Sequence, residues 1–382
     1  MTSIRTAAAT AGADPAATNT ATGTSTHTGT HTGPTSASAD GVPSKAAPQL
    51  RELVFGAARA AAVRAAASLG VADALGERPA TVAELATAVG AEPERLGRLL
   101  RSLACCGVFA ETADGRIAHT EMSRLLREDA PDSLKYICLW CTEPWTWETW
   151  PRLDTAVRSD TIAFNDIHGK DFFTYLHEDA PASARVFDKA MTTSSRQSAV
   201  ELADFLDLDG AKEVADIGGG QGHVVASLLE KHPKLRGTLL DLPQVVANAD
   251  PRLRDGGPLA ARARLVPGDC RREIPVQADL YIIKNILEWD DESTRRTLAN
   301  VVAAARPGAR VLVIENLLDN SPSMRFTTAM DLFLLLNVGG RKHSSDSLVT
   351  RMTEAGLSVT GISPVNPYLH AFDSRVPDRV AP

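Results

Sequence analysis

Three absences limit what this sequence can encode. It has no apolar run of about 18 residues and no apolar stretch near its N-terminus, so we expect neither a membrane span nor an export signal. It also has no long basic run, and its net charge is −7. Because nucleic-acid binding depends on clustered cations that neutralise phosphates, we expect a small molecule or a protein as the partner.

Cysteine is scarce too, with five in the chain. An odd number in a long chain without an export signal indicates free thiols in the reducing cytoplasm. Cys138 and Cys141 form a C-x-x-C, but a zinc site would need a second pair. We expect these two to pack or to line a pocket. The flexible His27 and His31 are a weak ligand set, so we predict no metal site.

The length of 382 residues fits two domains and a disordered tail. Residues 1–48 are rich in Thr, Ala, Gly and Ser and cannot bury enough apolar surface to offset the entropy of ordering. Residues 49–195 are predicted to form a mainly helical domain, and residues 196–382 an α/β domain.

Residues 50–119 carry an alanine-rich helix and then the pattern of a winged helix. Thr81 begins one helix and Gly90 ends it, residues 92–103 form a second helix, and "VFAETADGRIAHT" alternates as a hairpin around Asp114-Gly115. A winged helix can bind DNA, but acidic residues share the second helix. We therefore favour a module for dimerisation and for covering a substrate.

Four of the five tryptophans lie in "WCTEPWTWETW", within a mostly helical stretch over residues 133–200. They could form core, or they could wall a pocket for an aromatic substrate, with Trp147 as a wall residue. Both interpretations stay open from the sequence alone.

After residue 200, apolar strand patterns alternate with helices: EVADIGG, GHVVASLLEKH, GTLLDLP, ADLYIIKNIL, a helix over 292–305, and RVLVIEN. This alternation predicts a mainly parallel, doubly wound sheet, in which ligands bind beyond the carboxyl ends of the strands.

The turn after the first of these strands, "DIGGGQG", reads D-x-G-G-G-x-G and includes Asp216, Gly218 and Gly220. A nicotinamide-dinucleotide fingerprint would place its third glycine at position 223, which is a histidine. The pattern therefore indicates close backbone approach to a ligand without a pyrophosphate, such as the methionine part of S-adenosylmethionine.

Two later junctions supply carboxylates. Asp241 ends the second strand, at the offset of a carboxylate that accepts ribose hydroxyls. Asp269 follows in "VPGDCRR" and could accept the adenine amino group, with Cys270 against the ring; an ordinary Gly-Asp turn is the alternative.

Taken together, D-x-G-G-G-x-G, "DLPQV", "GD" and K-x-x-L…W-x-D over 284–291 resemble the S-adenosylmethionine-dependent O-methyltransferase family with a winged-helix dimerisation domain, over residues 50–375. The resemblance implies a homodimer, a Rossmann-like cofactor domain and a pocket for a phenolic acceptor such as an aromatic polyketide. The implied cofactor residues are Asp216, Gly218, Gly220, Asp241, Leu242, Asp269, Cys270, Lys284 and Trp289. The implied acceptor residues are Met191, Phe333 and Asn337.

The sequence departs from this family at the catalytic positions. The family pattern Lys-x-x-Leu-His-x-Trp supplies a histidine base, but "KNILEW" passes from Leu287 to Glu288 and Trp289. Of the two glutamates that orient that histidine, one matches Glu315, whereas Lys342 stands in the place of the other. The histidine is thus deleted, and one of its partners is lost.

Methyl transfer without that base remains feasible, because orientation alone can supply roughly 7–11 kcal/mol and a base adds about 10²–10⁴-fold. Glu288 or His343 could replace it, the phenol could arrive ionised, or the acceptor could be a ring carbon. The alternatives to a methyltransferase are a homologue that binds the cofactor but hydroxylates or decarboxylates and, less favoured, a DNA-binding regulator.

Overall fold

The computed structural model describes residues 45–319 and 321–378. Most of the predicted disordered tail, residues 1–44, lies outside this range. Its last residues do not: helix α1 (Ala46–Val54) begins before the predicted boundary at residue 48. Pro48 lies in the first turn, where the N–H that proline lacks would have no partner within the helix. By contacts, the chain divides into residues 1–52 and 53–382.

The predicted winged-helix pattern is confirmed in residues 56–124. Thr81 forms a capping box with Glu84 at the start of one helix, and Gly90 ends that helix in a left-handed conformation. The hairpin strands pair antiparallel, and Gly115 at their turn has a positive φ. The elements are α2 (Gly56–Leu69), α3 (Val71–Leu75), α4 (Val82–Val89), α5 (Pro93–Cys105), β1 (Phe109–Glu111), β2 (Ile117–His119) and α6 (Glu121–Arg124).

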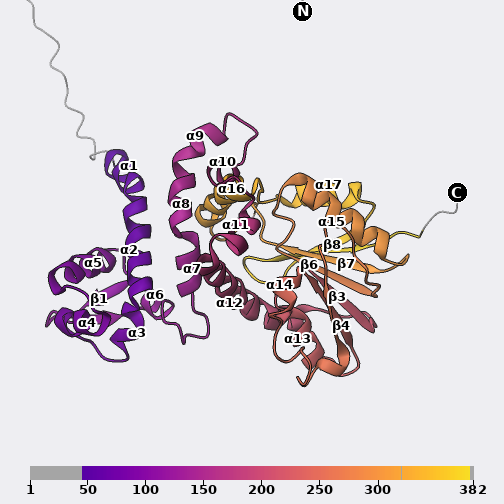
Figure 1. Cartoon of the computed structure of the whole chain (residues 1–382), viewed down its shortest axis with the longest axis horizontal. Coiled ribbons are helices and arrows are strands. Elements are labelled where there is room, and N and C mark those ends of the chain that lie inside the picture. The colour runs from indigo at the N-terminus through magenta and orange to yellow at the C-terminus, as the bar shows by residue number, and fades with distance from the viewer. Residues whose placement is uncertain (1–44, 320, 379–382) are drawn as a thin grey trace, which may run out of the picture. The chain divides into compact units, whose positions relative to one another are not determined.

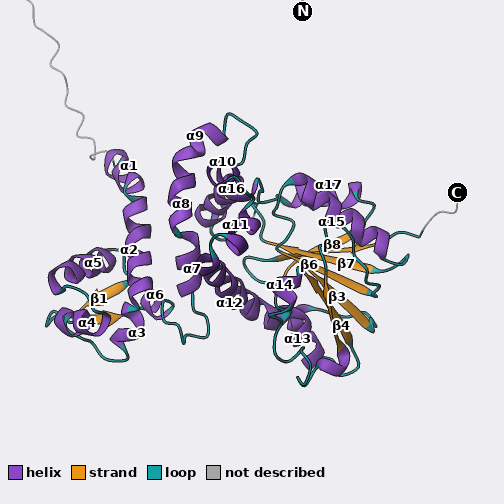
Figure 2. Ribbon diagram, viewed as in Figure 1, coloured by secondary structure: helices purple, strands orange, loops and turns teal. Residues whose placement is uncertain are grey.

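The next segment is helical, as predicted (Figure 2). Its last helix, α12, runs across the boundary predicted at 195/196, because residues 181–205 form one uninterrupted helix. The elements are α7 (Lys135–Cys141), α8 (Pro144–Thr149), η1 (Trp150–Arg152), α9 (Leu153–Ala156), α10 (Ala163–His168), α11 (Phe172–Glu178) and α12 (Pro181–Phe205).

A seven-stranded sheet, in the order β5-β4-β3-β6-β7-β9-β8, forms the rest of the fold (Figure 1). The first five strands in this order are parallel, and the last two pair antiparallel. The strands are β3 (Glu213–Ile217), β4 (Arg236–Asp241), β5 (Ala263–Pro267), β6 (Leu280–Lys284), β7 (Arg310–Glu315), β8 (Ser358–Pro364) and β9 (His370–Arg375). The helices are α13 (His223–Lys231), α14 (Pro243–Val246), η2 (Ala260–Arg262), α15 (Asp291–Ala304), α16 (Met324–Val338) and α17 (Ser345–Glu354).

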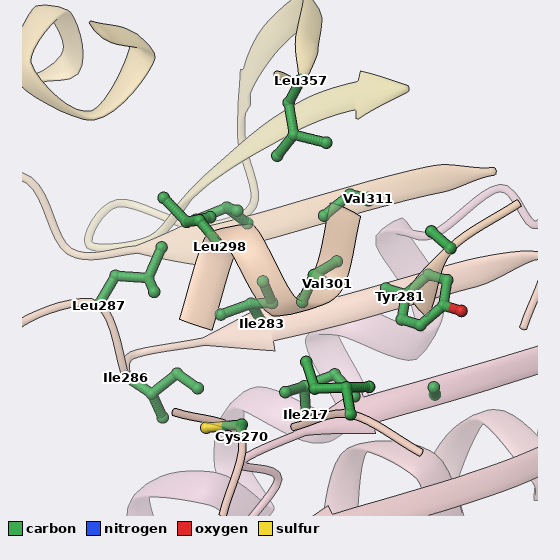
Figure 3. Close-up of a cluster of buried hydrophobic side chains, with 14 of the residues drawn as sticks. Ile217, Cys270, Tyr281, Ile283, Ile286, Leu287, Leu298, Val301, Val311 and Leu357 are labelled. Carbon is green, nitrogen blue, oxygen red and sulfur yellow. The ribbon is translucent and has the colours of Figure 1, made fainter. Parts of the chain in front are cut away.

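Alternating side chains of the strands build two cores, one on each face of the sheet. Ile217 and Ile283 pack with Leu298 of α15 on one face (Figure 3). Their neighbours Leu280 and Ile282 pack on the other face, against α12 and α13. Because both faces are covered by helices, the central strands are apolar throughout, and the polar groups gather at their carboxyl ends.

Candidate functional site

The glycine turn after β3 brings the backbone close to other groups. Gly218 has a φ of +64°, and a Cβ there would lie 2.7 Å from the side chain of Ile286. A Cβ on Gly219 would lie 2.4 Å from the carboxyl group of Asp216. Gly220 also has a positive φ, and its Cβ position is open. The turn therefore requires small residues at 218 and 219 and leaves space beside 220.

Asp216 lies under this turn and is fully buried, and neither of its carboxyl oxygens has a hydrogen-bond partner among the described residues. Burial raises the pKa of Asp216 to about 7, which Lys284 opposes and Asp241 reinforces. Burial likewise lowers the pKa of Lys284. Buried polar groups without partners are uncommon and mark this end of the sheet as a candidate ligand site.

Asp241, at the end of β4, is held by two backbone donors. The N–H of Gly220 donates to its Oδ2 at 2.8 Å, and the N–H of Leu242 donates to its Oδ1 at 2.7 Å. Burial nevertheless raises its pKa to about 6. Its side chain lines the cavity described below, so a ligand hydroxyl can reach the remaining lone pairs.

Asp269 is paired with a residue that the sequence analysis did not select. Both of its oxygens accept hydrogen bonds from the Arg271 side chain at 2.9 Å, and the guanidinium carbon of Arg271 lies 5.7 Å from the centre of the Trp289 ring. Burial alone would raise the pKa of Asp269, and the bonds from Arg271 lower it. The adjacent Cys270 is buried, which raises its thiol pKa to about 11.

These groups share one cavity of about 370 Å³. One end is lined by the glycine turn and the strand-end residues. The other end is lined by aromatic side chains from the helices: Trp140, Phe172, Phe173, Phe187 and Phe333.

The cavity contains some of the predicted acceptor residues and not others. Met191 and Phe333 line it. Trp147 does not, because its ring turns to donate from Nε1 to the carbonyl of Thr142 at 3.1 Å. Asn337 is buried beside the wall rather than in it, and its Nδ2 donates to the Phe333 carbonyl at 2.7 Å. Neither residue therefore lines the cavity.

The sequence left open whether the tryptophans form core or line a pocket, and the structure shows one tryptophan in each role. Trp140 lines the cavity and meets Phe333 with ring centres 5.2 Å apart. Trp145 is 3% exposed and packs against Phe164 and Phe172 as core. The same short segment thus supplies both pocket wall and hydrophobic core.

The candidate catalytic carboxylates are adjacent. Glu288 lines the cavity and forms an ion pair with the buried Lys342. Glu315 lies behind it, where Oε1 accepts the Leu287 N–H at 3.0 Å. Burial and the neighbouring Glu288 raise the pKa of Glu315 well above its usual range.

The third candidate, His343, is placed differently. Its ring is 3% exposed and does not line the cavity. Its Nε2 is 2.8 Å from the carbonyl oxygen of Leu287 and therefore carries the hydrogen. Burial lowers its pKa. A neutral ring that donates to the backbone is a structural role, and the geometry gives His343 no access to an acceptor.

Sequence reasoning also missed polar residues in the cavity. His223, directly after the glycine turn, lines it and bonds through Nδ1 to Asp250 at 2.8 Å. His177 and Asp188 line the helical end, where burial raises the pKa of Asp188. His223 could have been found from its place beside the turn. The other two lie on helices whose orientation the sequence does not show.

Cys138 and Cys141 lie one turn apart on α7, and neither lines the cavity. Burial raises the pKa of Cys141 to about 12, so its thiol is unreactive at neutral pH. Among residues 45–319 and 321–378, no three His, Cys, Asp or Glu side chains group as metal ligands, and no helix is long and apolar enough to cross a membrane.

Comparison with known proteins matches residues 150–358 to an O-methyltransferase domain family and residues 51–129 to the associated dimerisation domain. The mitomycin biosynthesis 6-O-methyltransferase of Streptomyces lavendulae is 37% identical over 81% of this chain and 88% of its own length. The aclacinomycin 10-hydroxylase of Streptomyces purpurascens is 30% identical over 78% of this chain and 81% of its own.

A solved structure gives a similar result. The O-methyltransferase of neocarzinostatin biosynthesis, in complex with S-adenosylmethionine and 2-hydroxy-5-methyl naphthoic acid, superposes with a TM-score of 0.71 at 31% identity. The match covers 84% of this chain and 96% of that one.

Proposed function

Because the chain belongs to the O-methyltransferase family and is an S-adenosylmethionine-dependent methyltransferase, we propose that it methylates a phenolic, polyketide-type aromatic intermediate of natural-product biosynthesis. The acceptor atom is a phenolic oxygen or an activated ring carbon. The supporting observation is the single cavity that joins strand-end polar groups to an aromatic wall.

The residues at the strand ends fit the cofactor. The glycine turn gives a close backbone approach where a Cβ would fill the space, and Asp216 keeps two buried oxygens without partners. When bound there, S-adenosylmethionine supplies an electrophilic methyl group. We assign Gly218, Gly220 and Lys284 to the methionine end and Asp241 with Leu242 to the ribose hydroxyls.

We assign the adenine end to the residues that follow β5 and β6. Asp269, Cys270 and Trp289 line that part of the cavity. Trp289 offers an apolar ring face, and Cys270 a small buried side chain. Because Arg271 already occupies both Asp269 oxygens, we expect Asp269 to accept an adenine amino hydrogen through the lone pairs that Arg271 leaves.

The aromatic end suits a planar acceptor. Phe172, Phe173, Phe187 and Phe333 present ring faces and edges from three different helices, and Met191 adds a thioether. Such a wall excludes water and fixes a ring by stacking and edge contacts. Orientation of this kind supplies roughly 7–11 kcal/mol of a displacement barrier, so methyl transfer does not require the histidine that the family usually has.

The dimerisation segment supports a homodimer. Leu53, Val54 and Phe55 are 77%, 72% and 66% exposed, and a cluster of exposed large apolar side chains marks an association surface. Phe55→Asp should shift the protein toward monomer in sedimentation experiments, whereas Glu121→Gln, a change to an exposed acid of α6, should leave it a dimer. A wild-type protein that sediments as a monomer would refute the homodimer.

The function is tested by incubating the purified protein with methyl-labelled S-adenosylmethionine and a panel of hydroxylated naphthoates, anthraquinones and phenazines. Mass spectrometry and NMR of the products locate the label on oxygen or carbon. We expect transfer to at least one phenol. Tight cofactor binding without transfer to any acceptor would contradict the proposal.

A second candidate, hydroxylation, is supported by the relative named as a hydroxylase and by the absence of the family histidine. The same incubations under ¹⁸O₂ distinguish it, because a hydroxylase product would carry ¹⁸O and no labelled methyl group.

A further inference from the structure

Methyl transfer to a phenol releases a proton. Beside the three aspartates of the strand-end region, Asp188 and Glu288 are the carboxyl groups that line the cavity among the described residues. Of these two, Glu288 is the one paired with a lysine. We propose that Glu288 is the proton acceptor for the phenolic hydroxyl, in place of the histidine that the family usually has, and that Lys342 and Glu315 position it. This proposal rests on the methyl-transfer function proposed above.

The backbone that carries Glu288 is held from several elements. The N–H of Leu287 donates to Glu315 of β7, and the Leu287 carbonyl accepts from His343. The Glu288 carbonyl accepts the N–H of Arg341 at 3.0 Å. These bonds fix the backbone on both sides of Glu288, and a fixed backbone helps to position a catalytic side chain.

The loop that follows α16 packs directly on this turn. A Cβ on Gly340 would lie 1.9 Å from the carbonyl oxygen of Glu288. This close approach brings Lys342 beside the Glu288 carboxylate, and the Lys342 N–H is itself anchored to Asp331 Oδ1 at 2.7 Å. Gly340 thus has a steric reason to be glycine, and the ion pair depends on it.

The side chain of Glu288 has two unlike oxygens. Oε1 accepts from the Lys342 ammonium group, and no Lys or Arg side chain in residues 45–319 and 321–378 pairs with the other oxygen. The side chain is 14% exposed, whereas that of Lys342 is 6% exposed. Glu288 lines the cavity and Lys342 does not, so a bound acceptor can reach the carboxyl group of Glu288 but not the ammonium group.

Charged groups from three elements surround the Glu288 carboxyl group. Lys342 faces it from the loop after α16, and Lys284 of β6 and Glu315 of β7 face it from the sheet. Burial and the neighbouring Glu288 raise the pKa of Glu315, whose Oε1 accepts the Leu287 N–H. Two lysine side chains, Lys342 and Lys284, therefore face the Glu288 carboxyl group.

The missing histidine and the lysine at position 342 are thus two parts of one change. A histidine base is compatible with two flanking glutamates, but a carboxylate base beside two more carboxylates would be strongly repelled. Replacing the second glutamate by Lys342 turns that repulsion into attraction. The ion pair with Glu288 thus gives a reason for a lysine at position 342.

The proposed step is balanced as follows. A lone pair of the phenol oxygen forms the new bond to the methyl carbon, and the electrons of the breaking carbon–sulfur bond stay on sulfur. The O–H bond breaks with its electrons left on oxygen, and the proton goes to Glu288. The products are the aryl methyl ether, S-adenosylhomocysteine and a protonated carboxyl group, which returns its proton to water.

The test compares Glu288→Gln with wild type on two phenols of similar shape, 1-naphthol and 4-nitro-1-naphthol, at a pH where only the second is ionised in solution. Glutamine keeps the shape and can still accept from Lys342. The control is Glu292→Gln, the same change at an exposed glutamate of α15 that pairs with Arg295. Calorimetric binding of S-adenosylhomocysteine shows whether each variant is folded and competent.

We expect Glu288→Gln to lower kcat/KM for 1-naphthol by about 10²–10⁴-fold and to change the rate with the ionised phenol by only a few-fold. Equal losses on both phenols, or no loss on either, would overturn Glu288 as proton acceptor. If wild type transfers label to neither phenol nor to the acceptor panel, the proposed function fails instead.

A second readout needs no turnover. Neutral and ionised 4-nitro-1-naphthol absorb at different wavelengths, so its spectrum in the complex with S-adenosylhomocysteine reports proton loss. Near the pKa of the free phenol, wild type should bind more of the ionised form than Glu288→Gln does. Identical spectra would contradict the proposal.

Lys342 is tested as a positioning residue. Lys342→Met leaves two carboxyl groups without the ammonium group, so the acid limb of the kcat/KM profile should move to higher pH, and Lys342→Arg should restore it. This pair also tests the proposal if Glu288→Gln does not fold. A profile that is the same in all three proteins would show that Lys342 does not act through Glu288.

Discussion

Asp241 gives the most direct test of the assigned cofactor site. Its carboxylate is fixed by the Gly220 and Leu242 N–H groups, at 2.8 and 2.7 Å, and faces the cavity. Asp241→Ala removes the acceptor that we assign to the ribose hydroxyls and leaves the two N–H groups without a side-chain partner. We expect weaker binding of S-adenosylmethionine with the fold retained.

The magnitude follows from the bonds that are lost. A hydrogen bond to a charged group contributes about 1.5–3 kcal/mol, and each 1.4 kcal/mol corresponds to tenfold in Kd. Losing one such bond weakens binding by roughly 10- to 100-fold, and losing both weakens it further. Asp241→Asn should fall between alanine and wild type, because its amide keeps one acceptor but places donors near Gly220.

Titration calorimetry with S-adenosylhomocysteine measures the change, and Asp255→Ala, at an exposed aspartate outside the cavity, is the control. An Asp241→Ala protein that binds the ligand as tightly as wild type would refute the assignment of this strand end to the ribose.

The Asp241 carboxylate also predicts how the affinity for the cofactor changes with pH. The ligand hydroxyls donate to the ionised form, and burial raises the pKa of Asp241 to about 6 in the free protein. Affinity should therefore be complete above this pH and fall as the pH drops through it. In Asp241→Ala this loss should be absent, so a pH dependence that survives the substitution would have to come from another group.

Two further predictions concern neighbouring structure. His343→Ala removes the donor to the Leu287 carbonyl and should lower the stability to unfolding in urea by about 1–3 kcal/mol, with the pH profile of kcat/KM unchanged in shape; a changed profile would restore His343 as a candidate base. Gly219→Ala places a Cβ 2.4 Å from the Asp216 carboxyl group and should cost about 1–3 kcal/mol of stability by overpacking. Gly220→Ala is its control, with only backbone strain near +62°, and equal Tm losses would show that the close contact with Asp216 does not matter.

Much of the fold was predictable from local signals. Thr81 and Gly90 mark their helix ends by capping chemistry, and Asp114-Gly115 marks its turn, because these signals act within a few residues. The boundary at 195/196 was less predictable, since the apolar face of α12 continues into the sheet domain and buries Leu202 there. Because α12 is one uninterrupted helix across this boundary, its hydrophobic periodicity shows no break there.

The site divides in the same way. Asp241 could be predicted because the carboxyl ends of parallel strands meet at one edge, so that strand order alone brings it to the cavity. Trp147 was misplaced as a wall residue because the sequence shows that a helix is aromatic but not which side chain turns inward. Its hydrogen bond to Thr142 decides that orientation. Glu288 and His343 were both candidate bases from the sequence. The choice between them needed contacts between residues far apart in the chain, such as that of Glu288 with Lys342, which no local pattern carries.

The strand-end residues and the aromatic residues of the cavity differ in how freely they can be substituted. At the cofactor end, ligand contacts depend on backbone geometry and on carboxylates bonded to that backbone, so Asp241 and the glycine turn constrain each other. In the aromatic part of the lining, Phe187 and Phe333 lie on separate helices, and both rings pack against Trp140. Substituting an aromatic side chain there alters the wall without moving a strand end. Substitutions of Phe187 or Phe333 should therefore leave the Asp241 carboxylate and its two backbone donors in place.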